Sequence, residues 1–154
     1  MKNMQQQLAT LTITAWVGGL WTIGYLAVPI LFQAQPDRQL AGMLASKMFE
    51  TLGYVGIVCA TYLLLYRWMA VGKQLLRDRD ALIVVVMLSI TLANLCYIQP
   101  LMADLKIQSL PLDVMQSSFA PQFKIWHGIS SILYLIESLL GAWLVIRTFF
   151  TPSK

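Results

Sequence analysis

Four long apolar runs alternate with short polar segments along the 154-residue chain. The runs cover about residues 8–32, 49–71, 81–105 and 125–150. A helix needs roughly 20 predominantly apolar residues to cross the hydrocarbon core of a bilayer. Because lipid offers no partner to an unpaired backbone N–H or C=O group, such runs form helices. The pattern therefore predicts an all-α protein, an integral membrane four-helix bundle that forms a single membrane domain over residues 1–154.

The first apolar run has to be distinguished from a cleaved signal peptide. It is longer than the roughly 7–15 residues of a signal core, and only Lys2 precedes it. The candidate cleavage site, FQA, places the bulky Phe32 where a small residue is preferred. We therefore expect this helix to be retained.

Basic residues are distributed unevenly between the two ends of the runs. The connection RWMAVGKQLLRDRD, between the second and third runs, contains four of them. With Lys2, Arg147 and Lys154 this side of the membrane has seven basic residues, and the other side has four. Since basic residues are enriched on the cytoplasmic side, we expect both termini to be cytoplasmic.

The two connections on the opposite side contain prolines, which interrupt helices. Pro36 follows the first run, and Asp37 is placed to cap a short helix through RQLAGMLASKMFE. Pro111 and Pro121 enclose a segment that can hold another short helix. We therefore expect short helices in both outer connections.

Composition supports a membrane protein and argues against other classes. Only 12% of the residues are charged and 58% are hydrophobic, with a mean hydropathy of +0.66, whereas soluble domains contain about 25% charged residues. The net charge of +4 does not indicate a nucleic-acid partner, because the basic residues lie in short connections. The expected partners are the lipid bilayer and another membrane protein or a second copy of the chain. The sequence contains no Walker loop, nucleophile elbow or HExxH motif, which disfavours an enzyme.

Small residues in the apolar runs predict where helices approach one another, since they let two backbones come close in a membrane. The expected packing residues are Gly18, Gly19 and Thr22 in the first run, Gly53 and Gly56 in the second, and Gly141 in the fourth.

The fourth run carries a polar stripe. His127, Ser131, Tyr134, Ser138 and Gly141 recur at spacings of three and four, which places them on one side of a helix. We expect this side to face the bundle interior, with Glu137 along one flank of the stripe.

Glu137 lies near the middle of this run, and Asn94 lies at a similar depth in the third. Each is thirteen residues from the cytoplasmic end of its run, or about 20 Å at 1.5 Å per residue. We expect the two side chains to meet and Glu137 to be neutral, because burial disfavours the anion and no basic residue lies at this depth.

The candidate intramembrane polar site therefore comprises Glu137, Asn94, Tyr134, Ser138 and Thr91. Two interpretations remain open. Intramembrane carboxylates often bind protons or ions; alternatively, a neutral acid holds two helices together through hydrogen bonds.

His127, the single histidine, is a candidate ligand or metal-binding residue together with Ser131. A metal ion there could recruit a methionine from the outer side, but a histidine that bonds to loop backbone is the favoured interpretation. One histidine excludes a haem held by two histidines of one chain. No cofactor is predicted, although haem and copper stay open through other ligand sets.

Two segments, WVGGLWTIGYLAVPILF in the first run and WHGISSILYLIESLLG in the fourth, resemble a known family. It is the bacterial four-helix membrane family called domain of unknown function 4149, which is similar to the eukaryotic transmembrane protein 205. The resemblance covers most of the chain and implies a protein of the bacterial cytoplasmic (inner) membrane, with no established reaction.

A more distant likeness is to CopD-type copper-resistance proteins and to the haem-containing protoporphyrinogen oxidase type. The oxidase type has a histidine in its first helix, where this chain has TITAWVGG. This departure argues against haem chemistry.

Together these observations favour a binding or accessory subunit of the inner membrane with a polar intramembrane site at Glu137 and Asn94. The first alternative is a small transporter or a protein that handles a copper-like metal ion. The second is a haem-dependent membrane oxidoreductase.

Overall fold

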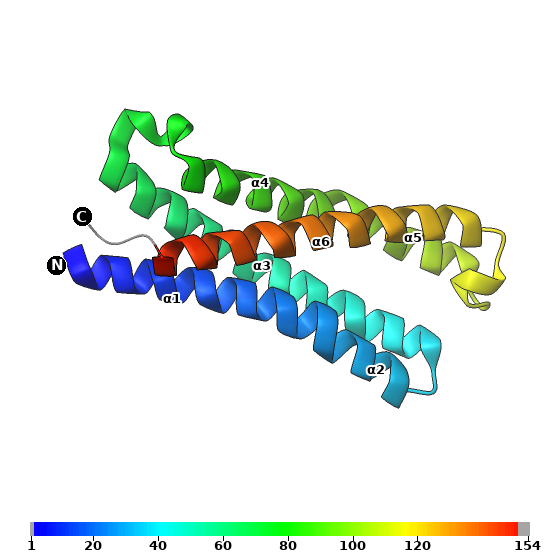
Figure 1. Ribbon diagram of the computed structural model, residues 1–154. Helices are drawn as coiled ribbons and strands as arrows, with labels where there is room; N and C mark the ends of the chain where they lie inside the picture. Colours follow the sequence, from blue (N-terminus) through cyan, green and yellow to red (C-terminus); the bar gives the residue numbers. More distant parts are fainter. Residues whose placement is uncertain (1, 151–154) are drawn as a thin grey trace.

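The computed structural model describes residues 2–150 of the chain. The described part does not include Lys154 or the side chain of Lys2, which both contribute to the predicted orientation. It also does not include the last residues of the predicted domain, 151–154. Within residues 2–150 the chain forms four helical rods joined by short connections (Figure 1). Each predicted apolar run lies within one of these rods.

Two rods are single helices and two contain a π-helical segment. In chain order the elements are α1 (Lys2–Trp21), η1 (Thr22–Ala27), α2 (Val28–Ala34), α3 (Arg38–Val71), η2 (Gly72–Arg77), α4 (Arg79–Ala93), η3 (Asn94–Ile98), α5 (Gln99–Ser109), η4 (Val114–Gln116) and α6 (Ala120–Phe150). The segments long and apolar enough to cross a membrane are Met4–Ala34, Arg38–Leu75, Arg79–Ser109 and Ala120–Thr148.

The π-helical segments η1 and η3 each lie just before a proline, Pro29 and Pro100 respectively. A proline inside a helix lacks an N–H donor, and its ring clashes with the carbonyl four residues earlier. In a membrane the freed backbone groups need other partners, and a local change to π geometry supplies them. The first and third rods therefore continue through their prolines.

The outer connections only partly match the expectation of two short helices. Asp37 caps a helix, as predicted, by accepting hydrogen bonds from the backbone N–H groups of Gln39 and Leu40. The prediction of a separate short helix there is wrong, however, because RQLAGMLASKMFE contains no helix breaker and continues into the second span as α3. In the other connection the 3₁₀ turn η4 forms after Asp113. Pro121 lies in the first turn of α6, where a missing N–H is tolerated.

The rods pack as a ring of four: α1 and α4 each contact both α3 and α6. The start of α1, the end of α6 and η2 lie at one end of the bundle, hereafter the η2 end (Figure 1). The α2–α3 connection and η4 lie at the opposite end, hereafter the η4 end. Toward the η4 end, the pair formed by α2 and α3 diverges from the pair formed by α5 and α6.

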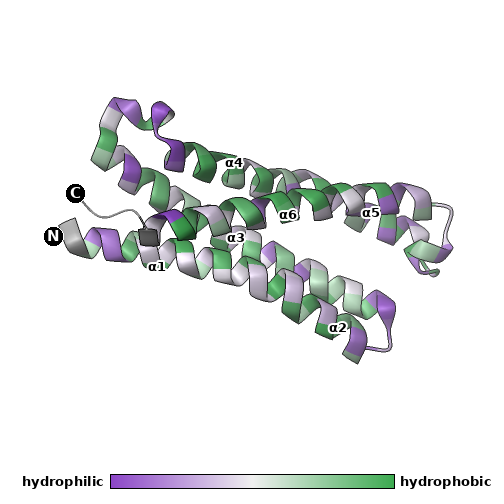
Figure 2. Ribbon diagram, in the orientation of Figure 1, coloured by the Kyte–Doolittle hydropathy of each residue, from purple (hydrophilic) through white to green (hydrophobic). Residues whose placement is uncertain are grey.

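The lateral surface of the bundle is apolar. Hydrophobic residues cover the middle of the rods and hydrophilic residues gather toward the two ends (Figure 2). Large side chains such as Val58, Ile132 and Leu139 are exposed on this surface. Such a surface is unfavourable in water and favourable in lipid. The chain is a multi-pass membrane protein.

Glycines bring the helices close together inside the ring. A methyl group added at Gly141 would lie 2.7 Å from Val17 Cγ2, and one added at Gly56 would lie 2.9 Å from the indole nitrogen of Trp16. Gly19 faces Leu52 and Gly53 faces Leu95 in the same manner.

Two of the expected packing residues lie elsewhere. Gly18 is exposed, with nothing within 4 Å of an added methyl group, and Thr22 is also exposed. Since neighbours in a helix are about 100° apart, Gly18 and Gly19 cannot both face the same partner.

Candidate functional site

Glu137 lies between α6 and α4 with only 3% of its surface exposed. Its Oε1 atom lies 2.8 Å from the hydroxyl oxygen of Thr91, which lies 3.0 Å from the carbonyl oxygen of Met87. The three groups form a chain of hydrogen-bonding atoms that joins the third and fourth rods. Thr91 and Glu137 both belong to the predicted polar site, and the structure brings them into direct contact.

Asn94 has a different partner from the one expected. Ser130 donates a hydrogen bond to Asn94 Oδ1 over 2.7 Å, and Asn94 Nδ2 donates to the carbonyl of Ile90. Across the residues that the structure describes, no hydrogen bond joins Asn94 to Glu137.

The observed register explains this difference. Thr91 of α4 lies level with Glu137 of α6. Asn94 therefore lies three residues, or about 4.5 Å, closer to the η4 end than Glu137, whereas the sequence placed the two at the same depth. The apolar runs mark each helix end only to within one or two residues, and the errors of two helices add.

Tyr134 links α6 to the first rod. Its hydroxyl donates to the carbonyl oxygen of Leu20 over 2.5 Å, just before η1. Its ring lies against Gly24, where a methyl group would overlap it, and packs edge-on to Phe49. Tyr134 is therefore near the polar site but bonds to the backbone of the first rod.

Ser138 follows Glu137 and is 1% exposed. Its carbonyl accepts a 3.4 Å hydrogen bond from the indole N–H of Trp21. Its hydroxyl oxygen is buried without a hydrogen-bond partner within residues 2–150. A buried hydroxyl of this kind has unused capacity to bond.

His127 and Ser131 do not join this group. Both are exposed, and Ser131 donates to the backbone carbonyl of His127 over 2.8 Å. The His127 ring stacks on Phe123 with centroids 6.0 Å apart. The stripe turns away from the interior here because the rods diverge toward the η4 end. In the described part of the chain, no group of three or more His, Cys, Asp and Glu side chains could hold a metal ion.

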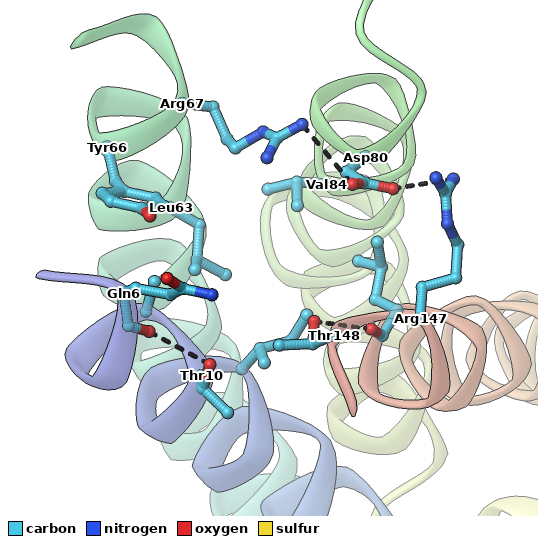
Figure 3. A pocket seen from close by; sticks show the side chains of 12 residues that line it. Gln6, Thr10, Leu63, Tyr66, Arg67, Asp80, Val84, Arg147 and Thr148 are labelled. Carbon is cyan, nitrogen blue, oxygen red and sulfur yellow. Dashed lines mark hydrogen bonds and ion pairs between the residues drawn. The ribbon is translucent and has the colours of Figure 1, made fainter. Parts of the chain in front are cut away.

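A charged cluster at the η2 end was not anticipated from the sequence. Arg67 of α3 donates to both carboxylate oxygens of Asp78, from Nε over 3.1 Å and from Nη2. Asp80 lies between two arginines, with Oδ2 at 3.4 Å from Arg67 Nη2 and Oδ1 at 2.8 Å from Arg147 Nη1 (Figure 3). The cluster therefore ties α3, α4 and α6 together.

A cavity of about 210 Å³ lies beside this cluster. Side chains of all four rods line it (Figure 3). Charged or polar lining residues include Arg67, Asp80 and Arg147, and apolar ones include Val84 and Leu144. The cavity thus has both hydrogen-bonding groups and an apolar lining.

Residues 11–110 match the family described as Domain of unknown function (DUF4149). The chain belongs to this family. Neither the search of curated proteins nor the search of solved structures found a match, so the expected likeness to transmembrane protein 205 and to CopD-type proteins is not shown.

The DUF4149 match covers only part of the polar site. It includes Thr91 and Asn94 and ends before α6, so Glu137 and Ser138 lie outside the matched residues. The family description assigns no reaction to either part.

Asp78 of this DUF4149 protein gives a prediction about acid stability. Burial opposes its ionisation, but hydrogen bonds from Arg67 and from the Ala81 N–H outweigh burial and hold the pKa of Asp78 below its ordinary value of 3.8. Because the folded-state pKa is lowered, the stabilisation is present above pH 3.8 and is lost as the pH falls through the folded-state pKa.

We expect Asp78→Asn to reduce the thermal unfolding temperature at pH 7 and to lessen its decline below about pH 4. The measurement is thermal unfolding in detergent from pH 7 to pH 3. The matched control is Asp104→Asn, which changes an exposed carboxylate near the η4 end. Equal pH profiles for the two variants would contradict a stabilising Asp78–Arg67 pair.

Proposed function

We propose that this DUF4149 protein is a binding or accessory subunit of the bacterial inner membrane, folded as a single membrane domain with both termini cytoplasmic. Its intramembrane site centres on Glu137 and Thr91, with Asn94, Tyr134 and Ser138 nearby. The uneven distribution of basic residues supports this orientation.

The observation that carries the proposal is the hydrogen-bond chain through Thr91. A threonine hydroxyl has one proton, yet its oxygen lies within hydrogen-bond distance of both Glu137 Oε1 and the Met87 carbonyl oxygen. If Glu137 were ionised, the two acceptors would compete for one proton. If Glu137 is protonated, its O–H donates to Thr91 and Thr91 donates to Met87. The geometry thus favours a neutral acid.

Unused bonding capacity supports a binding role over a purely structural one. Within residues 2–150, Thr91 is the single hydrogen-bond partner of the Glu137 carboxyl group. The adjacent Ser138 hydroxyl is buried and has no partner in that range. A small polar ligand that entered the interior of the bundle could bond to either group.

The test compares Glu137→Gln with Glu50→Gln after gentle purification from the native membrane. Glutamine keeps the size and can still bond to Thr91 but cannot exchange a proton. We expect Glu137→Gln to lose the infrared C=O stretch of a protonated carboxyl group. We expect Glu137→Leu, which has no polar side-chain atom, to lose bound small molecules or partner proteins, identified by mass spectrometry. Glu50, the other glutamate of the chain, pairs with Lys47 at 3.0 Å, and its variant should behave as wild type.

Retention of every bound species in Glu137→Leu would instead mean that the acid only joins α4 to α6. An infrared spectrum of an ionised Glu137 at pH 6 would contradict the neutral-acid chain.

A small proton-coupled transporter is a second candidate. The cavity at the η2 end lies about two helical turns from the Glu137 site. On α4, Val84 of the cavity lining is seven residues from Thr91, and on α6, Leu144 of the lining is seven residues from Glu137. Fully buried Met87 lies between them on α4. A proton entering from the η2 end would have to pass this residue. In acid-loaded vesicles, Glu137→Gln but not Glu50→Gln should then abolish proton release; equal release would exclude this candidate.

A further inference from the structure

The cavity at the η2 end is distinct from the Glu137 site. Its charged residues come from three helices: Arg67 from α3, Asp80 from α4 and Arg147 from α6. Gln6 and Thr10 of α1 complete its polar lining. Ile13, Val84 and Leu144 contribute apolar surface. The cavity therefore combines hydrogen-bond donors with a surface suited to hydrocarbon.

The two arginines have N–H donors that the cluster does not use. Arg67 directs Nε and Nη2 at Asp78. Arg147 Nη1 lies 2.8 Å from Asp80 Oδ1, but this oxygen has no aligned hydrogen bond within residues 2–150. The Arg147–Asp80 contact is thus an ion pair without hydrogen-bond geometry, and the guanidinium group of Arg147 can still bond to an anion.

The surrounding charge favours an anion as well. Lys73, Arg77 and Arg79 are exposed at the same end and make no ion pair with any described residue. With Arg67 and Arg147 they give five basic residues against the two carboxylates of Asp78 and Asp80. This end of the bundle is therefore positively charged.

We propose that this cavity binds a phosphate group, with Arg147 as the main donor and Arg67 as the second. A guanidinium group presents parallel N–H donors that match the oxygens of phosphate. The volume of about 210 Å³ equals roughly seven water molecules at about 30 Å³ each, enough for a phosphate with a short polar group.

The phosphate has two possible sources, a lipid headgroup and a free phosphate. The η2 end of a spanning bundle lies at the headgroup layer, where a phospholipid can place its phosphate at the arginines and an acyl chain against apolar side chains. Small phosphate compounds in the adjoining water can reach the same donors. The proposal does not depend on the role of Glu137.

Three probes are to be added to the detergent-purified full chain. They are phosphatidylglycerol, diacylglycerol, which lacks phosphate, and inorganic phosphate alone. Native mass spectrometry and ligand-dependent shifts in unfolding temperature measure binding. We expect phosphatidylglycerol to bind and diacylglycerol not to bind if the source is a lipid. Binding of inorganic phosphate alone would identify a free phosphate as sufficient. Binding of neither phosphate probe would overturn the proposal.

Matched variants separate the cavity from general charge attraction. Arg147→Gln should weaken binding by roughly tenfold to a hundredfold, because a charge-assisted hydrogen bond is lost. Arg79→Gln removes the same charge from an exposed residue outside the cavity lining and should change binding by no more than about twofold. Equal losses in the two variants would overturn the proposal.

A second variant covers the case in which Arg147→Gln fails to fold. Thr10→Leu adds volume at the cavity without changing charge. Binding inside the cavity should be lost in this variant, with the unfolding temperature of the ligand-free protein close to wild type. Unchanged phosphate binding would place the ligand outside the cavity and contradict the proposal.

Discussion

Replacing Trp16 by alanine should destabilise the bundle more than any other single change considered for this protein. Trp16 is 1% exposed, and its indole nitrogen lies close to Gly56 of α3. Removing the ring leaves a cavity at the α1–α3 contact, and the lining loses its dispersion contacts. We expect a loss of about 3–5 kcal/mol in the free energy of unfolding, by analogy with buried aromatic residues in soluble cores. Denaturant titration in detergent micelles measures it.

Trp143→Ala is the control for this prediction. Trp143 is 56% exposed on the lateral surface of α6, so truncating it creates no internal cavity. Its effect should stay below about 1 kcal/mol. If the two tryptophan variants unfold alike, the close α1–α3 packing does not contribute to stability.

The four rods could be predicted because hydropathy reports directly on the solvent that a helix contacts. In a membrane, a run of apolar residues is required at every span. The cap at Asp37 was also predictable, since its carboxylate bonds to nearby N–H groups of its own chain. The continuation of this helix into the second span as α3 was not predictable, because hydropathy marks the edge of the lipid and not the end of a helix.

The inward position of Glu137 and Ser138 followed from helical periodicity, but their partners did not. Periodicity gives the direction of a side chain around its own helix. The hydrogen-bond partners of that side chain depend on the axial register between two packed helices, which periodicity does not give. The predicted alignment of α4 with α6 was wrong by three residues, so Asn94 was expected beside Glu137, where the structure has Thr91. Gly141 of α6 packs against Met87 of α4, whose Cε atom would lie 3.2 Å from an added methyl group, and the sequence alone does not reveal this contact between the two helices.

The cluster at the η2 end was missed for a different reason. The distribution of basic residues predicts the orientation of the chain, but it assigns no partner to the acidic residues Asp78 and Asp80. An acidic residue at the mouth of a membrane helix needs a cation or water. Arg67 and Arg147 lie in the sequence at the helix ends predicted to share the side of Asp78 and Asp80. These two arginines are therefore the partners that the sequence offers to the two carboxylates.

Gly141→Ala should separate α6 from α1 and lower the stability of the bundle. The added methyl group would lie 2.7 Å from Val17 Cγ2 and 3.2 Å from Met87 Cε. Overpacking costs about 1–3 kcal/mol, which exceeds the gain of up to about 1 kcal/mol that alanine has over glycine in a helix. Val17 is β-branched and stiff, so it cannot easily turn away. The unfolding temperature in detergent should therefore fall.

The double variant Val17→Ala, Gly141→Ala tests this cause directly, because it removes the atom against which the new methyl group would collide. Its loss of stability should be smaller than the sum of the two single losses by about 1 kcal/mol or more. Gly128→Ala, at a position of α6 with nothing within 4 Å of an added methyl group, should leave stability unchanged or slightly raised. Additive losses would mean that α6 accommodates the methyl group without moving. A coupled loss would mean that α1 and α6 meet too closely at Gly141 to admit a methyl group without moving apart.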